Sequence, residues 1–343
     1  MHSTGWDGVL PDANAAPDRR VIAAWICAAA LALPLPTVAA ELPAESASNA
    51  WRAFAARQTA MTHPLCKWEQ HRSFYWEIGD ANGVLASGRV GGRVHADTVM
   101  NVGSASKWLY AAYVVEKFGD SPDSRAYLNF TSGYSNFDST GCSDFGRVDQ
   151  CPPGPQDVQE AVGGVFHYDG GHMQQHALLI GLGPMRNGAL AAEVGAFLGT
   201  EMDLKYKKPQ PAGGARGTAR NYARFLRRLL TDSPQPLQLG ALLGSHAVCT
   251  LPGEGCNASP EVALPEAWHY GLGHWIEDDP QATPQANFAY SSPGLFGFYP
   301  WVDIDRKLYG ILARQGLDIV NEAYSSARCG RLIRWAWKTG IPQ

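Results

Sequence analysis

Apolar residues along this chain follow a strand-like pattern at both ends and a helical pattern between them. Near the beginning, residues 73–79 and 83–89 are strand-like runs on either side of a turn signal at residues 80–83. Towards the end, four more strand-like runs cover residues 268–277, 287–292, 296–302 and 308–314. The pattern therefore predicts strands from both ends of the chain.

A helical period governs the middle of the chain. In residues 106–118 the apolar residues from Leu109 to Phe118 recur every three to four positions, and Gly119 is a typical helix end. Residues 120–154 and 232–265 are rich in turn-forming residues and are predicted to be loops. Further helices are predicted at residues 50–62, 156–161, 172–180, 190–198, 218–231 and 318–338.

The order of these elements indicates an α/β (α+β) fold. We expect one antiparallel β-sheet flanked by helices, built from residues of about 41–103 and 266–343. An all-helical subdomain of about residues 104–265 is then inserted into it. A functional cleft is expected where two such parts meet.

Composition and charge exclude some classes of protein. With 45% hydrophobic residues the chain has enough apolar side chains for a sizeable core. The net charge is -4, and the sequence contains no Lys/Arg run and no zinc-type Cys/His spacing. These features argue against a nucleic-acid partner and against a metal site.

The first forty residues resemble an export signal. Arg19 and Arg20 precede an apolar run over residues 21–35, and small residues at 38–40 offer a cleavage site. We expect residues 1–40 to be a signal peptide, residues 41–343 to form the mature domain, and no stable membrane span to remain after cleavage. A retained anchor is the alternative. The mature protein would be periplasmic or secreted.

The cysteines agree with an oxidising compartment. Seven are present, and Cys27 falls within the predicted signal, which leaves an even number for disulfides. Fifteen pairings are possible for six cysteines. Short loops favour the pairs Cys142–Cys151 and Cys249–Cys256, and this choice leaves Cys66–Cys329.

Candidate chemistry begins at Ser104. In the segment Ser104-Ala105-Ser106-Lys107 the serine opens a predicted helix, so Lys107 lies one turn later on the same face. A serine hydroxyl needs a base to act as a nucleophile, and a lysine can serve if burial lowers its pKa. The helix N-terminus also offers unpaired N–H groups for an oxyanion. The alternative is a helix-capping serine followed by a solvated lysine.

Residues 101–107 (NVGSASK) and the apolar helix that follows are similar to the nucleophile segment of serine β-lactamases, DD-peptidases and related esterases. Other segments resemble later motifs of the same family in the same order. They are 129–134 (NFTSGY), 166–170 (FHYDG), 213–221 (GGARGTARN), 270–273 (YGLG) and 292–297 (SPGLFG). The resemblance covers roughly residues 70–343 and implies a β-lactamase/transpeptidase-like fold.

The resemblance also implies roles for individual residues. Tyr168 would be the second catalytic group beside Ser104 and Lys107, with Tyr134 as a rival. The backbone N–H groups of Ser104 and Leu295 would hold the oxyanion, and Gly294 would let the backbone approach the substrate closely.

The sequence departs from the family pattern at several positions. Phe130 stands where His is usual, and Gly170 replaces the Asn that follows the tyrosine. Ser292 and Pro293 replace the pair that normally includes a Lys or His. Arg314 on a neighbouring strand is a candidate substitute for that cation, with a surface arginine as the alternative. His172 is expected on a helix surface.

The predicted function is that of a serine hydrolase. It would act through an acyl-serine intermediate on an ester, amide or β-lactam, with a small molecule or peptide as substrate and without metal or organic cofactor. The alternative from another class is a catalytically silent binding protein on the same scaffold.

Overall fold

The fold is described from a computed structural model for residues 48–67, 72–261, 263–316 and 322–343. The predicted signal peptide, residues 1–40, and the beginning of the last predicted helix lie outside the described residues. The strands are β1 Phe74–Asp80, β2 Gly83–Val90, β3 Met100–Asn101, β4 Lys205–Tyr206, β5 Ala215–Gly217, β6 Val248–Cys249, β7 His269–Gly271, β8 His274–Glu277, β9 Ala289–Ser291, β10 Tyr299–Asp303 and β11 Tyr309–Arg314. The helices are α1 Asn49–Thr62, α3 Ala105–Phe118, α4 Pro122–Leu128, α5 Val158–Gly163, α6 Gly171–Leu179, α7 Asn187–Leu198, α8 Ala219–Leu229, α9 Gln238–Ala241 and α10 Glu322–Thr339.

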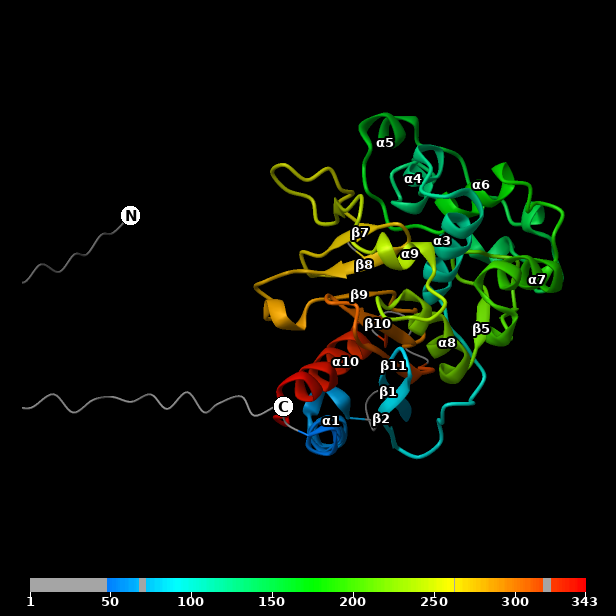
Figure 1. The fold of residues 1–343 in the computed structure, drawn as a ribbon. Coiled ribbons are helices and arrows are strands. Elements are labelled where there is room, and N and C mark those ends of the chain that lie inside the picture. The colour runs from blue at the N-terminus through cyan, green and yellow to red at the C-terminus, as the bar shows by residue number, and fades with distance from the viewer. Residues whose placement is uncertain (1–47, 68–71, 262, 317–321) are drawn as a thin grey trace, which may run out of the picture. The chain divides into compact units, whose positions relative to one another are not determined.

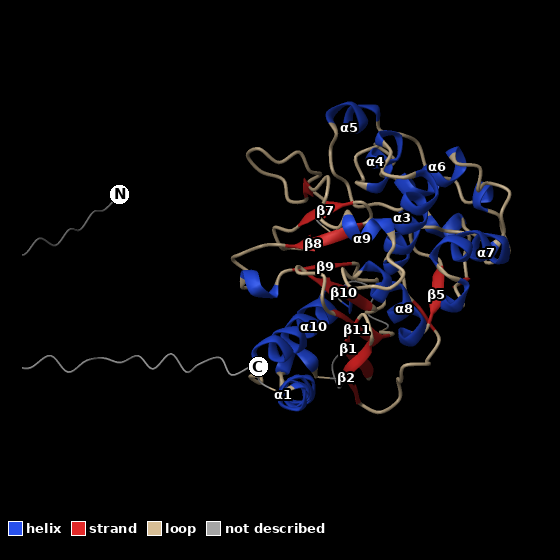
Figure 2. Ribbon diagram, viewed as in Figure 1, coloured by secondary structure: helices blue, strands red, loops and turns tan. Residues whose placement is uncertain are grey.

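Strands from both ends of the described chain form one antiparallel sheet (Figure 2). Its eight described strands follow the order β2-β1-β11-β10-β9-β8-β7-β6. The early strand β1 pairs with the last strand β11, from Phe74 opposite Arg314 to Gly79 opposite Tyr309. The sheet predicted from the sequence pattern is thereby confirmed.

Helices cover both faces of this sheet (Figure 1). On one face α10 packs against β10 and β11, and α1 packs against α10. On the other face α8 packs against the same two strands, and the long buried helix α3 packs against α7. Because α3 is buried over almost its whole length, its first residues are held rigidly.

Several expectations about local structure are wrong. Residues 232–265 are not all loop, because they contain α9 and β6, and the short strands β4 and β5 lie within the subdomain that was expected to be all-helical. Residues 120–154 are not all loop, because α4 begins at Pro122, where the Ser121 side chain accepts the Asp123 N–H. The strand-like run 268–277 is a hairpin of two strands, since Leu272 and Gly273 adopt positive φ angles of 43° and 77°. The apolar pattern continues through that turn because the turn packs on α3, where a Cβ on Gly273 would lie 2.8 Å from the Lys107 carbonyl oxygen.

The three disulfides favoured by the cysteine spacing are confirmed. Cys142 pairs with Cys151 and Cys249 pairs with Cys256, and both bridges close short loops. Cys66 pairs with Cys329 and ties the segment after α1 to α10. None of the helices in the described part of the chain is long and apolar enough to cross a membrane.

Candidate active site

A tight turn between β3 and α3 presents Ser104. Gly103 adopts a positive φ of 56°, and a Cβ at this position would lie 2.9 Å from the Leu295 nitrogen. The turn therefore needs glycine both for its backbone conformation and for the close approach of another chain segment. Ser104 holds the N-cap position of α3, but its side chain makes no capping hydrogen bond to the helix.

Lys107 lies one helical turn after Ser104 and faces the same way. Its Nζ donates to Ser104 Oγ at 3.0 Å and to the Ala212 carbonyl oxygen at 3.0 Å. Only 5% of the Lys107 surface is exposed. The spacing of the two residues in the sequence predicts this proximity, whereas the burial of Lys107 results from the tertiary fold.

The Ser106 side chain stabilises the turn at Gly103 and Ser104 through two hydrogen bonds. Its hydroxyl donates to the Gly103 carbonyl oxygen at 2.6 Å and accepts the Ala215 N–H at 3.1 Å. The Val102 N–H donates to the Ala215 carbonyl oxygen at 3.1 Å. The short strand β5 thus holds the backbone on both sides of Ser104.

The segment after β9 brings a second backbone donor to Ser104. A Cβ on Gly294 would lie 2.0 Å from the Val102 carbonyl oxygen, so the two segments touch through backbone alone. Ser292 Oγ donates to the Ser104 carbonyl oxygen at 3.0 Å. Within the described residues, neither the Ser104 N–H nor the Leu295 N–H donates to a protein acceptor. Two unpaired donors beside one hydroxyl have the chemistry of an oxyanion hole.

Tyr168 lies beside Lys107, with its ring towards the ammonium group. The distance from Lys107 Nζ to the ring centroid is 4.9 Å. The ring stacks on Trp275 at 5.0 Å and meets Phe130 edge-on at 5.4 Å. The Tyr168 hydroxyl makes no hydrogen bond to another described residue. Its role in proton transfer stays a prediction.

Neither Tyr134 nor Arg314 makes a hydrogen bond or ring contact with Ser104, Lys107 or Tyr168. Tyr134 stacks on Tyr127, with ring centroids 6.3 Å apart. Arg314 is not a surface arginine, because it is fully buried against the Phe74 ring and its Nη1 donates to Glu322 at 3.4 Å. Burial lowers the pKa of Arg314 to about 10.

The expectation of a surface position for His172 is wrong. The side chain is fully buried, with Ser132 Oγ 2.7 Å from Nδ1 and the His167 carbonyl oxygen 3.0 Å from Nε2. Phe130, which stands where the family has His, stacks on this imidazole at 5.1 Å. Burial lowers the pKa of His172 to about 3, so the ring is neutral and structural.

A cavity of about 300 Å³ opens beside Ser104 and Lys107. The sequence analysis placed Ser104, Lys107, Tyr168, Gly294 and Leu295 in the site, and Ser104, Lys107 and Leu295 line this cavity. Gly294 touches the turn before Ser104 but is not part of the lining. Tyr168 is not part of its lining. Residues that the sequence analysis missed also line it, namely Phe137, Ser139, Lys207, Lys208 and Gln210. They come from loops whose patterns carry no signal of a shared site.

Phe137 occupies the space that Gly170 leaves open. A Cβ on Gly170 would lie 3.0 Å from the Phe137 ring. The Phe137 N–H donates to Asp169 Oδ1 at 3.2 Å, and the Gly171 N–H donates to the same oxygen at 2.7 Å. Burial raises the pKa of Asp169. An apolar ring thus lies in the space beside Gly170.

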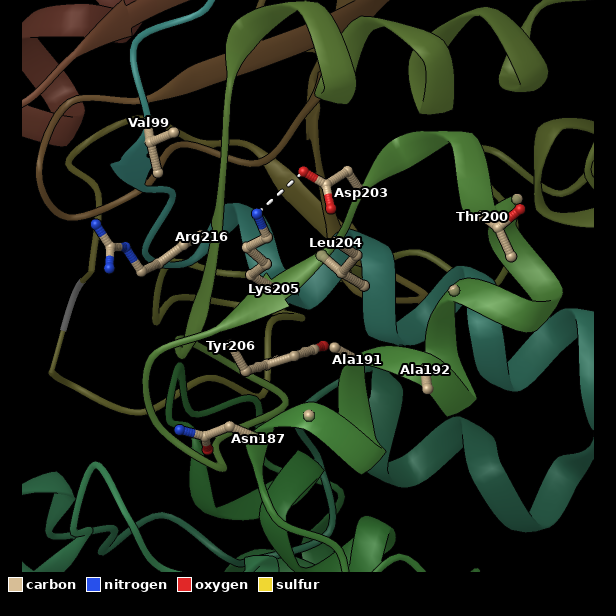
Figure 3. A pocket seen from close by; sticks show the side chains of 13 residues that line it. Val99, Asn187, Ala191, Ala192, Thr200, Asp203, Leu204, Lys205, Tyr206 and Arg216 are labelled. Carbon is tan, nitrogen blue, oxygen red and sulfur yellow. Dashed lines mark ion pairs between the residues drawn. The ribbon is translucent and has the colours of Figure 1, made fainter.

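A second cavity, of about 510 Å³, lies between α7 and the strand β4 (Figure 3). Neither Ser104 nor Lys107 lines it. Its wall along α7 consists of small residues, and its other side carries Val99, Tyr206, Arg216 and Lys205, which is paired with Asp203 at 3.1 Å. No group of three or more His, Cys, Asp or Glu residues in the described part of the chain is arranged to hold a metal ion.

The antiparallel sheet and the helices on its two faces define a β-lactamase-like fold. Three solved structures illustrate the likeness. A putative β-lactamase from Bacteroides dorei DSM 17855 is 18% identical, with a TM-score of 0.55, and the match covers 78% of this chain and 96% of that one. EstCE1, a hydrolase with promiscuous acyltransferase activity, is 14% identical, with a TM-score of 0.57 and coverage of 84% and 98%.

The third structure is a D-stereospecific amidohydrolase from Streptomyces sp., which is 14% identical with a TM-score of 0.52, and the match covers 82% of this chain and 99% of that one. At these identities the likeness shows the fold alone. The fold predicted from the sequence is confirmed. No known family and no curated protein matches the sequence itself.

Proposed function

We propose that this protein is a serine hydrolase that works through an acyl-serine intermediate. The observation that carries the proposal is the 3.0 Å contact between Lys107 Nζ and Ser104 Oγ in a buried position at a helix N-terminus. The buried Lys107 amine is the proposed base for the Ser104 hydroxyl. The unpaired N–H groups of Ser104 and Leu295 are the proposed oxyanion hole. The hydrolases among the structural neighbours support the same class of activity.

The reaction has two steps. In the first step Ser104 Oγ bonds to the carbonyl carbon of the substrate while the hydroxyl proton passes to Lys107 Nζ. The resulting oxyanion accepts hydrogen bonds from the N–H groups of Ser104 and Leu295. The bond to the leaving group then breaks, and the leaving oxygen or nitrogen takes up the proton. Water then attacks the acyl-serine, the bond between the acyl carbon and Ser104 Oγ breaks, a proton from the water returns to Oγ, and the acyl group leaves as a carboxylic acid.

Tyr168 is the proposed second carrier of that proton. Its ring is 4.9 Å from Lys107 Nζ, and its hydroxyl has no other partner among the described residues. A phenol in this place can relay a proton between the lysine and the leaving group. Residues 41–343 are proposed as the mature exported enzyme, and the three disulfides agree with an oxidising compartment.

The substrate is an ester, an amide or a β-lactam. The position of the family's amide is taken by Gly170 and the Phe137 ring, so an acylamino group has no side-chain amide to bind at this point. The apolar walls Phe137, Leu295 and Phe296 suit an apolar acyl group.

Labelling with a fluorophosphonate probe tests the proposal. We expect a covalent adduct on Ser104 by mass spectrometry, no labelling of the Ser104→Ala variant, and labelling at least about a hundredfold slower in Lys107→Met. Lys117→Met is the matched control, because Lys117 lies on the same helix but pairs with Glu193. Wild-type protein that is folded yet unlabelled by the probe and by β-lactams would support the silent binding protein instead.

A further inference from the structure

The small sheet that contacts the Ser104 turn has one face exposed to solvent. It consists of β3, β5 and β4 in that order, and Asn101 and Lys205 both pair directly with Arg216. Directly opposite residues of antiparallel strands point to the same face of a sheet. Asn101, Arg216 and Lys205 therefore form one row across the sheet.

This row joins the two cavities. Asn101 lines the cavity at Ser104, whereas Arg216 and Lys205 line the second cavity (Figure 3). Arg216 and Lys205 are exposed, while Tyr206 and Ala215 on the opposite face are buried in the core. The row therefore leads from the half-buried Asn101 at the first cavity to the exposed Arg216 and Lys205 at the second, which Tyr206 also lines.

The surface along this path is basic in a chain whose net charge is -4. Lys207 and Lys208 line the first cavity, and Lys205 and Arg216 line the second. Two of these cations have carboxylate partners, with Lys205 paired to Asp203 at 3.1 Å and Lys207 to Asp144 at 3.8 Å. Among the described residues, Arg216 and Lys208 have no carboxylate partner. Arg216 is the better anchor of the two because its guanidinium can hold a carboxylate with two hydrogen bonds.

Strand geometry sets the length of the path. Ser104 lies three positions after Asn101 in the sequence, and opposite Cα atoms are about 5 Å apart, so the Cα atoms of Arg216 and Ser104 lie at most about 15 Å apart. An extended chain of about four residues covers that distance.

We propose that this face of the small sheet extends the substrate site, and that Arg216 binds a carboxylate of a linear substrate at most about four extended residues from the scissile carbonyl. The position of that carbonyl rests on the proposed function of Ser104. The substrate class is an extended, peptide-like ester or amide that is neutral at the scissile bond and anionic at its far end.

A spacer series tests the distance. The substrates are 4-nitrophenyl monoesters of glutaric acid whose second carboxyl carries one to five glycines, ending in a carboxylate or in a carboxamide. We expect the ratio of kcat/KM for carboxylate over carboxamide to rise with spacer length to about tenfold, which corresponds to about 1.4 kcal/mol. A ratio that does not change with spacer length would overturn the proposal.

Substitutions of Arg216 test whether this residue binds the carboxylate. In Arg216→Gln the ratio for the long spacers should fall to about one, and in Arg216→Glu it should fall below one, because the charge is reversed. Arg89→Gln is the matched control, since Arg89 is an exposed arginine on β2 of the large sheet, and it should keep the wild-type ratio. An unchanged ratio in Arg216→Gln would also overturn the proposal.

A binding measurement separates this inference from the proposed function. Calorimetry on the Ser104→Ala protein should show tighter binding of glutaryl-pentaglycine as the free acid than as the carboxamide, and Arg216→Gln should remove the difference. Preferential binding without any ester turnover would refute the hydrolase and leave the extended site standing. Ester turnover without this binding preference would refute the extended site and leave the hydrolase standing.

Discussion

The phenyl ring of Phe137 stands 3.0 Å from the point where a Cβ of residue 170 would lie, so Gly170 is the residue that makes room for the ring. The two residues come from separate loops, and both line the cavity at Ser104. The backbone of Gly170 has an ordinary φ of -75°, so glycine is not needed there for its conformation. Glycine suits position 170 because a side chain there would meet the Phe137 ring.

This pairing predicts a non-additive effect of two substitutions. Gly170→Asn should reduce the free energy of unfolding by about 1–3 kcal/mol, because the added side chain meets the ring. Phe137→Ala removes the ring, so the double variant Phe137→Ala/Gly170→Asn should be destabilised by less than the sum of the two single effects. Urea unfolding of the four proteins in a double-mutant cycle measures the coupling, and strictly additive effects would show that the contact is unimportant.

The long-range disulfide should stabilise the protein more than a short-range one. Cys66 and Cys329 are 263 residues apart in sequence, whereas Cys142 and Cys151 are only 9 apart. Loop-closure entropy then gives about 5 kcal/mol for the first bridge and about 3 kcal/mol for the second.

We therefore expect the Cys66→Ala/Cys329→Ala protein to lose more unfolding free energy than Cys142→Ala/Cys151→Ala. Urea unfolding under non-reducing conditions makes the comparison. If the short-loop variant is the less stable of the two, local strain or packing outweighs the entropy of the unfolded chain.

His274 should make stability depend on pH. It is fully buried, its Nδ1–H donates to the Leu272 carbonyl oxygen at 3.2 Å, and its Nε2 accepts the Gly244 N–H at 3.2 Å. A proton on Nε2 would face another N–H, and burial lowers the pKa of His274 to about 4. The unfolded chain binds this proton near pH 6.5, and the native state does not.

The His274 contribution is therefore complete above about pH 6.5 and is lost as the pH falls towards 4, by about 3 kcal/mol in total. His172 and His176, with pKa values lowered by burial to about 3 and about 4, add to the same trend. His274→Gln should reduce the number of protons taken up on unfolding at pH 5 by about one. His95→Gln, at an exposed loop position, is the control and should leave that number unchanged. An equal slope of unfolding free energy against pH in wild type and His274→Gln would contradict the prediction.

Sequence reasoning found features that depend on near neighbours in the chain. Alternation and helical period predicted β1, β2, the strands from β7 to β11 and most helices, because each element buries one side of its own backbone. The short strands β4, β5 and β6 were not predicted. It failed where a short local signal opposed the composition of its surroundings. The cap Ser121-Pro122 begins α4 within a glycine-rich stretch, and the turn at Leu272-Gly273 divides a continuous apolar run.

The sequence by itself determined the spacing of Ser104 and Lys107, since one helical turn brings those side chains together wherever the helix lies. Only the tertiary structure decided that the Leu295 nitrogen meets Gly103, that Phe137 fills the space at Gly170, and that Arg216 lies in one row with Asn101. Those relationships join segments far apart in the chain. They arise from the packing of whole sheets and helices, for which a local pattern carries no information.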